Sequence, residues 1–278
     1  MMQAAIATED YEFIRRLVYE HSRINLGEDK TELVRSRVQK RLRVLGMQDF
    51  ETYCHLLDSP EGEQELTALL DVISTNVTHF FREHRHFEYL QDVALPAWQQ
   101  TAGAKPGAAL RVWSAACSSG EEPYSIAILL ADFFRGRPAA DWQIIATDIS
   151  TRMLATAEQG IYQTDRVTLP VAEWLSVYFQ RGTGSWEGRC RVKSSLRQRV
   201  SFQRLNLIEW PYPFTQKFDL IFCRNVMIYF DRETQAQLVP HLVEQLAPGG
   251  HLVVGHSESL IGIEHRLKTR EPSIYCYA

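Results

Sequence analysis

Residues 111–127 constrain this chain more than any other segment. Their sequence, RVWSAACSSGEEPYSIA, combines a buried strand, a turn of very small residues, two acids and the start of a helix. Small side chains let a ligand approach the backbone at the carboxyl end of a strand, where open α/β sheets bind their ligands. The segment therefore predicts the binding turn for a nucleotide-type cofactor.

The two acids of this turn discriminate between cofactors. A pyrophosphate prefers a helix N-terminus without negative charge, so Glu121 and Glu122 would repel it. S-Adenosylmethionine has no phosphate, and it carries a sulfonium, an ammonium and ribose hydroxyls that acids can bind. The turn also has a single glycine, Gly120, where dinucleotide folds use the pattern GxGxxG. We therefore expect S-adenosylmethionine rather than NAD.

The hydrophobic pattern divides the chain into two regions. Residues 9–75 contain no strand-like run, and apolar residues such as Val34, Val38 and Leu42 recur at helical spacing. From about residue 109, apolar runs such as WQIIATD and FDLIFCRN alternate with helical stretches, as in parallel sheets. We expect a helical N-terminal domain over 1–75, a linker over 76–108, and a doubly wound α/β domain over 109–278.

Residues 175–205 interrupt this alternation. Gly182, Gly184 and Gly188 lie between two short strand-like segments, VYFQR and RCRVK, which is typical of an antiparallel hairpin. We expect an inserted antiparallel β-subdomain at about 175–200. Its edge is either surface decoration or a place where an extended peptide adds a strand, and the residues alone favour neither.

Polar residues end several of the predicted strands. Asp148 ends WQIIATD, where an acid accepts hydrogen bonds from ribose hydroxyls, although it could instead cap the next helix. Asn206 and Asn225 also follow predicted strands, so their amides would face the same crevice. Tyr229 is either a phenol beside the reacting atoms or a core aromatic.

Charge and cysteine content limit the classes of protein. A net charge of −4 argues against a nucleic-acid partner, and five cysteines without a CxxC pair suit a reducing cytoplasm. We see no signal peptide or membrane span. His79, His84 and His86 are close in sequence, but without an acid or cysteine at ligand spacing we expect no metal site.

Four motifs resemble the chemotaxis receptor methyltransferases of the CheR family. They are STNVTHFFRE (74–83), RVWSAACSSGEEPYSIA, FDLIFCRNVMIYFD (218–231) and GHSES (255–259). The likeness covers nearly the whole chain in the same order. It implies an enzyme that transfers the methyl group of S-adenosylmethionine to glutamate side chains of bacterial chemoreceptors, giving glutamyl methyl esters and S-adenosylhomocysteine.

The resemblance also implies roles for individual residues. A cofactor-facing loop within 76–108 carries Arg82, which would flank the transferred methyl group together with Tyr229 as the catalytic pair. The residues expected to contact the cofactor are Asn76, Thr78, Arg82, Glu122, Asp148, Asn206, Leu207 and Asn225.

Two surfaces are candidates for receptor binding. A charge run such as RSRVQKRLR (35–43) is usually a solvated helix face, but the resemblance implies an acidic partner, the cytoplasmic helical bundle of a chemoreceptor. The contacts expected there are Arg35, Arg37, Arg41 and Arg43. A receptor C-terminal pentapeptide would contact Arg181, Gly182, Gly184, Arg189 and Arg197 of the β-subdomain.

Two other functions remain open at this stage. One is a carboxyl methyltransferase for small molecules, against which the basic helix and the β-subdomain argue. The other is a non-catalytic adaptor that binds S-adenosylmethionine, against which the presence of Arg82 and Tyr229 argues.

Overall fold

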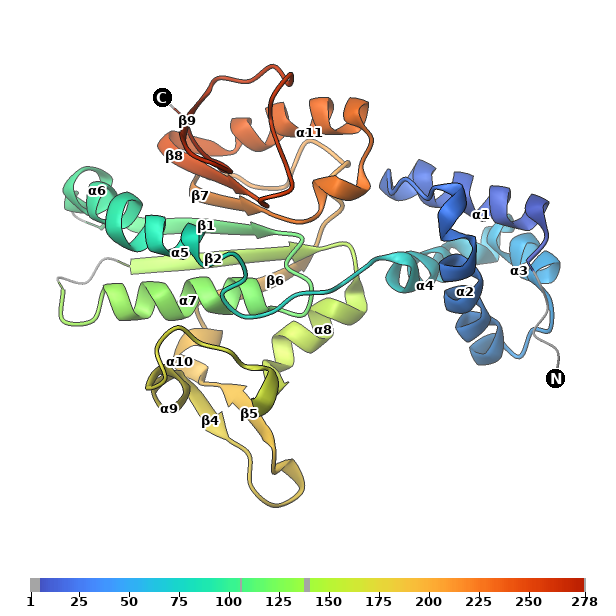
Figure 1. The fold of residues 1–278 in the computed structure, drawn as a ribbon, viewed down its shortest axis with the longest axis horizontal. Helices are drawn as coiled ribbons and strands as arrows, with labels where there is room; N and C mark the ends of the chain where they lie inside the picture. Colours follow the sequence, from blue (N-terminus) through green and yellow to red (C-terminus); the bar gives the residue numbers. More distant parts are fainter. Residues whose placement is uncertain (1–5, 106, 138–140, 278) are drawn as a thin grey trace. The chain divides into compact units, whose positions relative to one another are not determined.

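A computed structural model describes residues 6–105, 107–137 and 141–277 (Figure 1). The chain divides into two compact units. Residues up to 75 together with 229–234 form the helical unit, and residues 76–228 together with 235–278 form the sheet unit.

The helical unit contains four α-helices within the described residues, and the predicted helical character of this region is confirmed. They are α1 (Thr8–Ser22), α2 (Thr31–Leu45), α3 (Phe50–Leu57) and α4 (Glu63–Ile73). The predicted apolar stripe Val34, Val38 and Leu42 is buried. Gly46 ends α2 in the left-handed conformation, with φ 70°, which glycine adopts without steric cost.

Two arginines of α2 bind inside the helical unit. Arg41 makes a two-point ion pair with the buried Glu65, with nitrogen–oxygen distances of 2.8 and 2.6 Å, and Glu65 also accepts a hydrogen bond of 2.7 Å from Tyr53. Arg37 donates to the carbonyl oxygens of Ile73 and Ser74 at the end of α4, where a cation stabilises a helix. Both guanidinium groups therefore stabilise this unit from within.

A seven-stranded sheet forms the centre of the sheet unit, in the order β6-β2-β1-β7-β8-β10-β9. The first five strands in this order are parallel, and β10 is antiparallel to both of its neighbours. The strands are β1 (Ala109–Ala115), β2 (Asp141–Asp148), β6 (Val200–Arg204), β7 (Phe218–Cys223), β8 (Leu246–Val254), β9 (Leu267–Glu271) and β10 (Ile274–Tyr277).

The helices expected between these strands are present: α7 (Glu121–Phe133), α8 (Thr151–Gln159) and α11 (Arg232–Glu244). The predicted doubly wound fold is thus confirmed for the parallel part of the sheet. The antiparallel pair β9 and β10 was not predicted, because β9 has the sequence LKTRE and lacks a recognisable apolar run.

The segment expected as a linker is largely helical. It contains α5 (Arg85–Tyr89), a π-helical turn (Leu90–Ala94) and α6 (Leu95–Gln100). Phe87, Leu90 and Leu95 are buried in the core of the sheet unit. Pro96 lies in the first turn of α6, where proline is tolerated, so it does not mark an extended connection.

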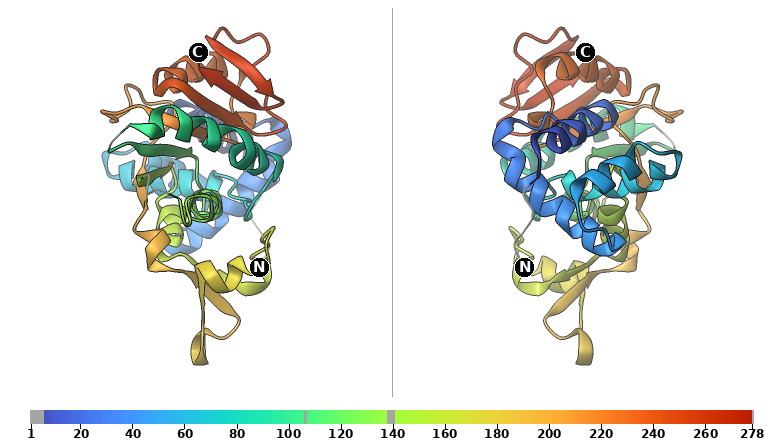
Figure 2. Two further views of the ribbon diagram at one scale, coloured as in Figure 1. Left: turned by 90° about the vertical axis from the view of Figure 1, so that its left-hand side faces the viewer. Right: turned by 90° about the vertical axis from the view of Figure 1, so that its right-hand side faces the viewer.

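The predicted β-subdomain is a three-stranded antiparallel sheet in the order β3-β5-β4. The hairpin of β4 (Phe179–Arg181) and β5 (Arg189–Val192) was expected, whereas β3 (Ile161–Gln163) comes from an earlier part of the chain. The helices α9 (Trp174–Tyr178) and α10 (Ser194–Arg197) flank the hairpin. Figure 2 shows the hairpin projecting from the sheet unit, with β4 at one edge of its sheet.

All five cysteines lie in the described segments and are free thiols. Among the helices of those segments, none has both the length and the apolar composition needed to cross a membrane.

Candidate active site

The strand order places a topological switch point between β1 and β7. From β1 the chain continues to β2 and β6 on one side, and later to β7 and β8 on the other. Ala115 at the end of β1 pairs with Cys223 at the end of β7. Open α/β sheets bind ligands beyond the carboxyl ends of strands at such a point, so the segments after β1 and β7 define the candidate site.

The turn after β1 has an unusual backbone. Ala116, Ser118 and Gly120 all have positive φ angles, of 64°, 49° and 96°. A side chain at Gly120 would bring its Cβ within 2.8 Å of Ala157 Cβ and 2.9 Å of the Tyr162 hydroxyl oxygen. The turn can therefore form only with glycine at this position.

Asp148 holds this turn from the neighbouring strand. Its side chain is buried, with Oδ2 accepting a hydrogen bond of 2.7 Å from the Ser118 N–H and Oδ1 one of 2.9 Å from the Ser150 N–H. The Ser150 hydroxyl, not Asp148, caps α8 through the Met153 N–H. A carboxylate has about four acceptor positions, and it can accept from a ribose hydroxyl as well as from backbone amides.

Glu122 pairs with the buried Arg224, whose place beside Asn225 after a strand predicts that it faces the crevice but predicts no role. Its Oε1 accepts from the Ser114 hydroxyl at 2.7 Å, and its Oε2 lies 3.0 Å from Arg224 Nη1. The pKa of Glu122 is raised by burial, which the Arg224 charge opposes. The Arg224 side chain is 1% exposed, and its Nη2 donates to Glu83 and to the backbone oxygen of Arg82.

The loop over residues 76–83 runs beside the cofactor turn and α7. The Asn76 carbonyl accepts from the Ser118 hydroxyl at 3.2 Å, and the Phe81 N–H donates to Ser125 at 2.9 Å. Arg82 donates to the Val77 carbonyl at 2.9 Å. Thr78, the residue after Val77, is half-buried. The bonds to Ser118 and Ser125 hold the loop that carries Arg82 beside the cofactor turn.

The segments after β6 and β7 contribute the other predicted residues. The Leu205 N–H donates to the Asp148 carbonyl at 3.1 Å, and Asn206 and Leu207 follow as buried residues. The side-chain amide of Asn225 donates to Glu83 at 3.2 Å. The predicted cofactor contacts thus lie at the carboxyl edge of the parallel strands or in the loop beside the cofactor turn.

Tyr229 is the exception among the predicted site residues. It belongs to the helical unit, where its carbonyl oxygen accepts a hydrogen bond of 2.9 Å from the Asn25 N–H. Its approach to Arg82 therefore stays a prediction.

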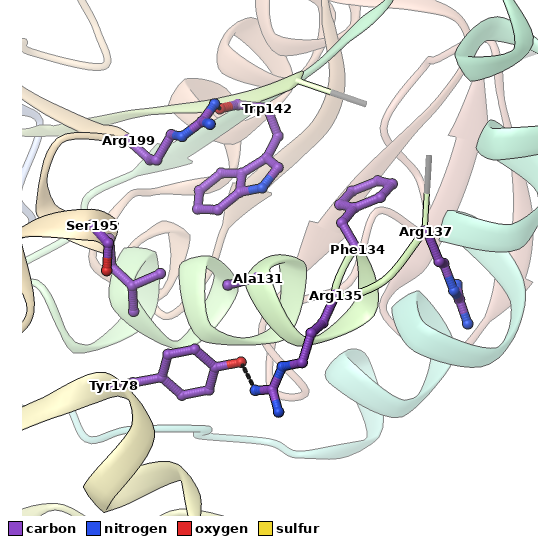
Figure 3. Close-up of a pocket in the computed structure, with 9 residues that line it drawn as sticks. Ala131, Phe134, Arg135, Arg137, Trp142, Tyr178, Ser195 and Arg199 are labelled. Atoms are coloured by element: carbon purple, nitrogen blue, oxygen red, sulfur yellow. Dashed lines mark hydrogen bonds between the residues drawn. The ribbon is translucent and has the colours of Figure 1, made fainter. Parts of the chain in front are cut away.

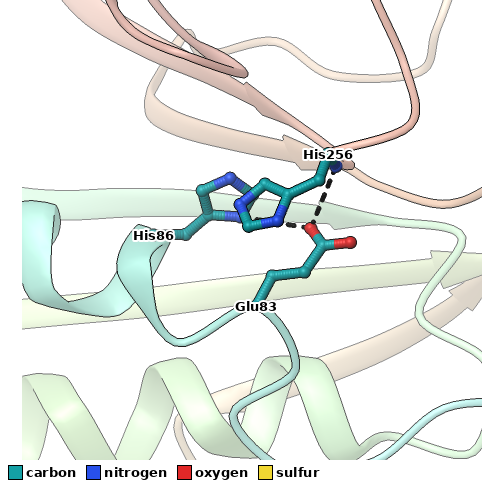
Figure 4. Close-up of side chains that lie close together, drawn as sticks. All are labelled: Glu83, His86 and His256. Carbon is teal, nitrogen blue, oxygen red and sulfur yellow. Dashed lines mark hydrogen bonds and ion pairs between the residues drawn. The ribbon is translucent and has the colours of Figure 1, made fainter.

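Three potential metal ligands, Glu83, His86 and His256, lie within 4.8 Å of one another (Figure 4). Glu83 lies three residues before His86, so an acid does stand at ligand spacing, contrary to what we stated from the sequence. Burial lowers the pKa of His86 to about 3, so its imidazole is neutral. Glu83, however, already binds the Arg224 guanidinium at 3.0 Å, and that positive charge disfavours a cation there. The expectation of no metal site stays a prediction.

A separate pocket of about 300 Å³ lies at the amino end of β2 (Figure 3). Its lining includes Arg135, Trp142, Tyr178 and Arg199. Arg135 donates to the Tyr178 hydroxyl at 2.6 Å, and Arg199 lies over the Trp142 ring. Because Trp142 is the second residue of β2 and Asp148 is the last, this pocket is distinct from the cofactor edge.

The side chains at the carboxyl edge fit S-adenosylmethionine. The buried carboxylate of Asp148 and the largely buried carboxylate of Glu122 can accept hydrogen bonds from hydroxyl and ammonium groups, and the turn after β1 leaves little side-chain bulk. Burial raises the pKa of the Cys117 thiol in this turn well above its usual range, so we expect this cysteine to be unreactive.

Comparisons with known proteins identify the family to which both parts of the chain are similar. The family model described as CheR methyltransferase, SAM binding domain, matches residues 76–276, and the CheR methyltransferase all-alpha domain matches residues 9–74. The sheet unit is therefore the S-adenosylmethionine-binding domain of a methyltransferase.

Curated relatives match over nearly the full length. The chain is 41% identical to a chemotaxis protein methyltransferase of Escherichia coli, covering 99% of this chain and 93% of the relative. It is 41% identical to chemotaxis protein methyltransferase 2 of Pseudomonas aeruginosa (96% and 92% covered) and 38% identical to a relative in Borreliella burgdorferi (92% and 90%). This chain belongs to the CheR methyltransferase family.

We predict that Asp148→Asn weakens binding of S-adenosylhomocysteine by about 1.5–3 kcal/mol, the range for hydrogen bonds to a charged group. Asp141→Asn, at the opposite end of β2, is the matched control and should leave affinity unchanged. Calorimetric titration of both folded variants measures this difference. Equal affinities of the two variants for S-adenosylhomocysteine would show that Asp148 does not bind the ribose.

Proposed function

We propose that this methyltransferase acts on glutamate side chains in the cytoplasmic helical bundle of chemoreceptors and forms glutamyl methyl esters. The observation that carries this proposal is the loop over 76–83, which hydrogen bonds hold beside the cofactor turn together with Arg82. The names of the curated relatives support a role in chemotaxis. We place the enzyme in cytoplasmic signal transduction, and its free thiols suit that compartment.

The chemistry requires positioning more than acid–base catalysis. A glutamate side chain has a reference pKa of about 4.3, so the attacking carboxylate is already ionised near neutral pH. The cofactor provides a methyl group bonded to a positively charged sulfur. In our proposal Arg82 orients the substrate carboxylate through its planar guanidinium, and Tyr229 steers it with one hydrogen bond.

Two alternatives can be separated from this proposal by assay. A small-molecule carboxyl methyltransferase would not methylate receptor fragments. A non-catalytic adaptor would bind S-adenosylhomocysteine without transferring a methyl group.

Arg82→Ala should lower the rate of methyl transfer by orders of magnitude, and Tyr229→Phe should lower it less, because orientation is the main catalytic contribution. Single-turnover rates at saturating S-adenosylmethionine separate this effect from cofactor binding. Arg85→Ala is the control, since Arg85 follows Arg82 by three residues and its side chain is 75% exposed. Rates for both site variants equal to the control would contradict the mechanism.

The proposed receptor surface on α2 is narrower than its sequence suggests. Arg37 and Arg41 bind within the helical unit, and Arg35 pairs with Glu32. Arg43 is exposed, as is Lys40 on the same helix. We propose that Arg43 is the main contact for the acidic receptor helices, while Arg37 and Arg41 keep α2 in place.

Lys40→Glu combined with Arg43→Glu should raise the KM for receptor and leave affinity for S-adenosylhomocysteine unchanged, because the change repels an acidic partner. The same charge change at Lys268 and Arg270, two exposed residues of β9, is the matched control. The wild-type reaction should also weaken with added salt. If the KM for receptor equals that of the control, this face of α2 is a solvated surface and does not bind the receptor.

We further propose that a receptor C-terminal pentapeptide adds a strand to the outer edge of β4. Arg181 and Arg189 are exposed near this edge, and Arg197 lies on the adjoining α10. Arg189 also lies over Trp186, whose side chain is half exposed. Added backbone hydrogen bonds and a carboxylate–arginine contact would tether the enzyme near its substrate.

Acidic pentapeptides that end in an aromatic residue should bind with micromolar affinity. Gly182→Val with Gly184→Val should abolish this binding, because a side chain at 182 would overlap the Trp186 carbonyl and Gly184 has a positive φ of 60°. Binding of S-adenosylhomocysteine should survive as the internal control. Equal methylation of receptors with and without their tails, and no calorimetric signal with the peptides, would contradict the tether.

A further inference from the structure

Glu258 has an unusual set of partners. It lies in the segment after β8, its side chain is buried, and its carboxylate accepts five backbone N–H groups. Oε2 accepts from Gly255 at 2.6 Å and from Asn225 at 2.8 Å. Oε1 accepts from Met227, Val226 and Ile228 at 2.7, 2.9 and 3.3 Å.

These bonds join the loops that follow two neighbouring parallel strands. Residues 224–228 follow β7, and residues 255–258 follow β8. The loops are in close contact, since a Cβ at Gly255 would lie 2.6 Å from the side-chain nitrogen Nδ2 of Asn225 and 2.7 Å from Glu258 Oε2. The Glu258 carboxylate thus joins the loop after β7 to the loop after β8 at the carboxyl edge of the sheet.

Asn225 is held on two sides. Its φ of 57° lies in the left-handed region, which asparagine tolerates better than most other residues. Glu258 binds the Asn225 N–H and the three that follow, while Glu83 binds the Asn225 side-chain amide. The backbone and the side chain of Asn225 are therefore fixed by two different carboxylates.

We propose that Glu258 is a positioning residue for the cofactor: its carboxylate holds the backbone of residues 225–228 so that the Asn225 side chain faces the cofactor edge. The proposal rests on the contact between Asn225 and the cofactor that the family resemblance implies. Glu258 acts through the backbone amides and does not itself contact the cofactor. Glutamine cannot replace it, because the NH₂ group of a carboxamide would face backbone N–H donors.

The test compares variants of Glu258 with the same variants of Glu264, an exposed residue of the same connection. Glu258→Gln should weaken calorimetric binding of S-adenosylhomocysteine at least tenfold and raise the KM for S-adenosylmethionine, whereas Glu264→Gln should change neither. Glu258→Ala should lose affinity similarly. Added formate should restore part of it, because a free carboxylate can occupy the vacated space.

Formate separates positioning from a general loss of stability. It should not restore Glu258→Gln, whose side chain still fills the site, nor affect Glu264→Ala. An affinity of Glu258→Gln within twofold of Glu264→Gln, or a loss in Glu258→Ala that formate leaves unchanged, would overturn the proposal.

If the alanine and glutamine variants do not fold, Glu258→Asp decides the question. It keeps the charge but is too short to reach all five amides, so it should bind S-adenosylhomocysteine several-fold more weakly. Its melting temperature should lie closer to that of the wild type than those of the alanine and glutamine variants, because part of the amide set stays paired. Unchanged affinity would overturn the proposal. Because the readout is cofactor binding, its failure is distinguishable from failure of the proposed receptor substrate.

Discussion

The buried guanidinium of Arg224 is the interaction on which the candidate site depends. It binds Glu83 and Glu122 at 3.0 Å each and also donates to the Arg82 carbonyl. A buried charge that loses a partner destabilises a protein by several kcal/mol, so these segments are favoured to be in place together. The loop that carries Arg82, the first turn of α7 and the end of β7 therefore form one unit around a single cation.

The core of the fold could be predicted because its signals are local. Each buried parallel strand is a continuous apolar run, and the residues at its carboxyl end reach the binding edge through the topology alone. Asp148 and Asn225 were found in this way. Asn76 and Arg82 were predicted as site residues only from the family resemblance, because the residues around them do not by themselves indicate a binding site.

The remaining features depend on contacts between residues distant in sequence. Glu83 and His256 are 173 residues apart, yet the His256 N–H donates to the Glu83 carboxylate. The charge run predicted Arg41 as an exposed receptor contact, whereas in the structure it pairs with Glu65 of α4. A charge run indicates which helix face is polar, but not whether its partner is internal or external.

Gly120 illustrates how sequence variation at this site will have to be interpreted. Its φ of 96° and the closeness of Ala157 and Tyr162 forbid any other side chain. Tyr162 belongs to β3 of the small sheet, and its hydroxyl donates to the Ser119 carbonyl at 2.8 Å. In a saturation mutagenesis screen this position would tolerate no substitution, although glycine has no side chain that could contact a ligand. Intolerance there would report how closely the turn packs against α8 and the small sheet, and not a contact with a ligand.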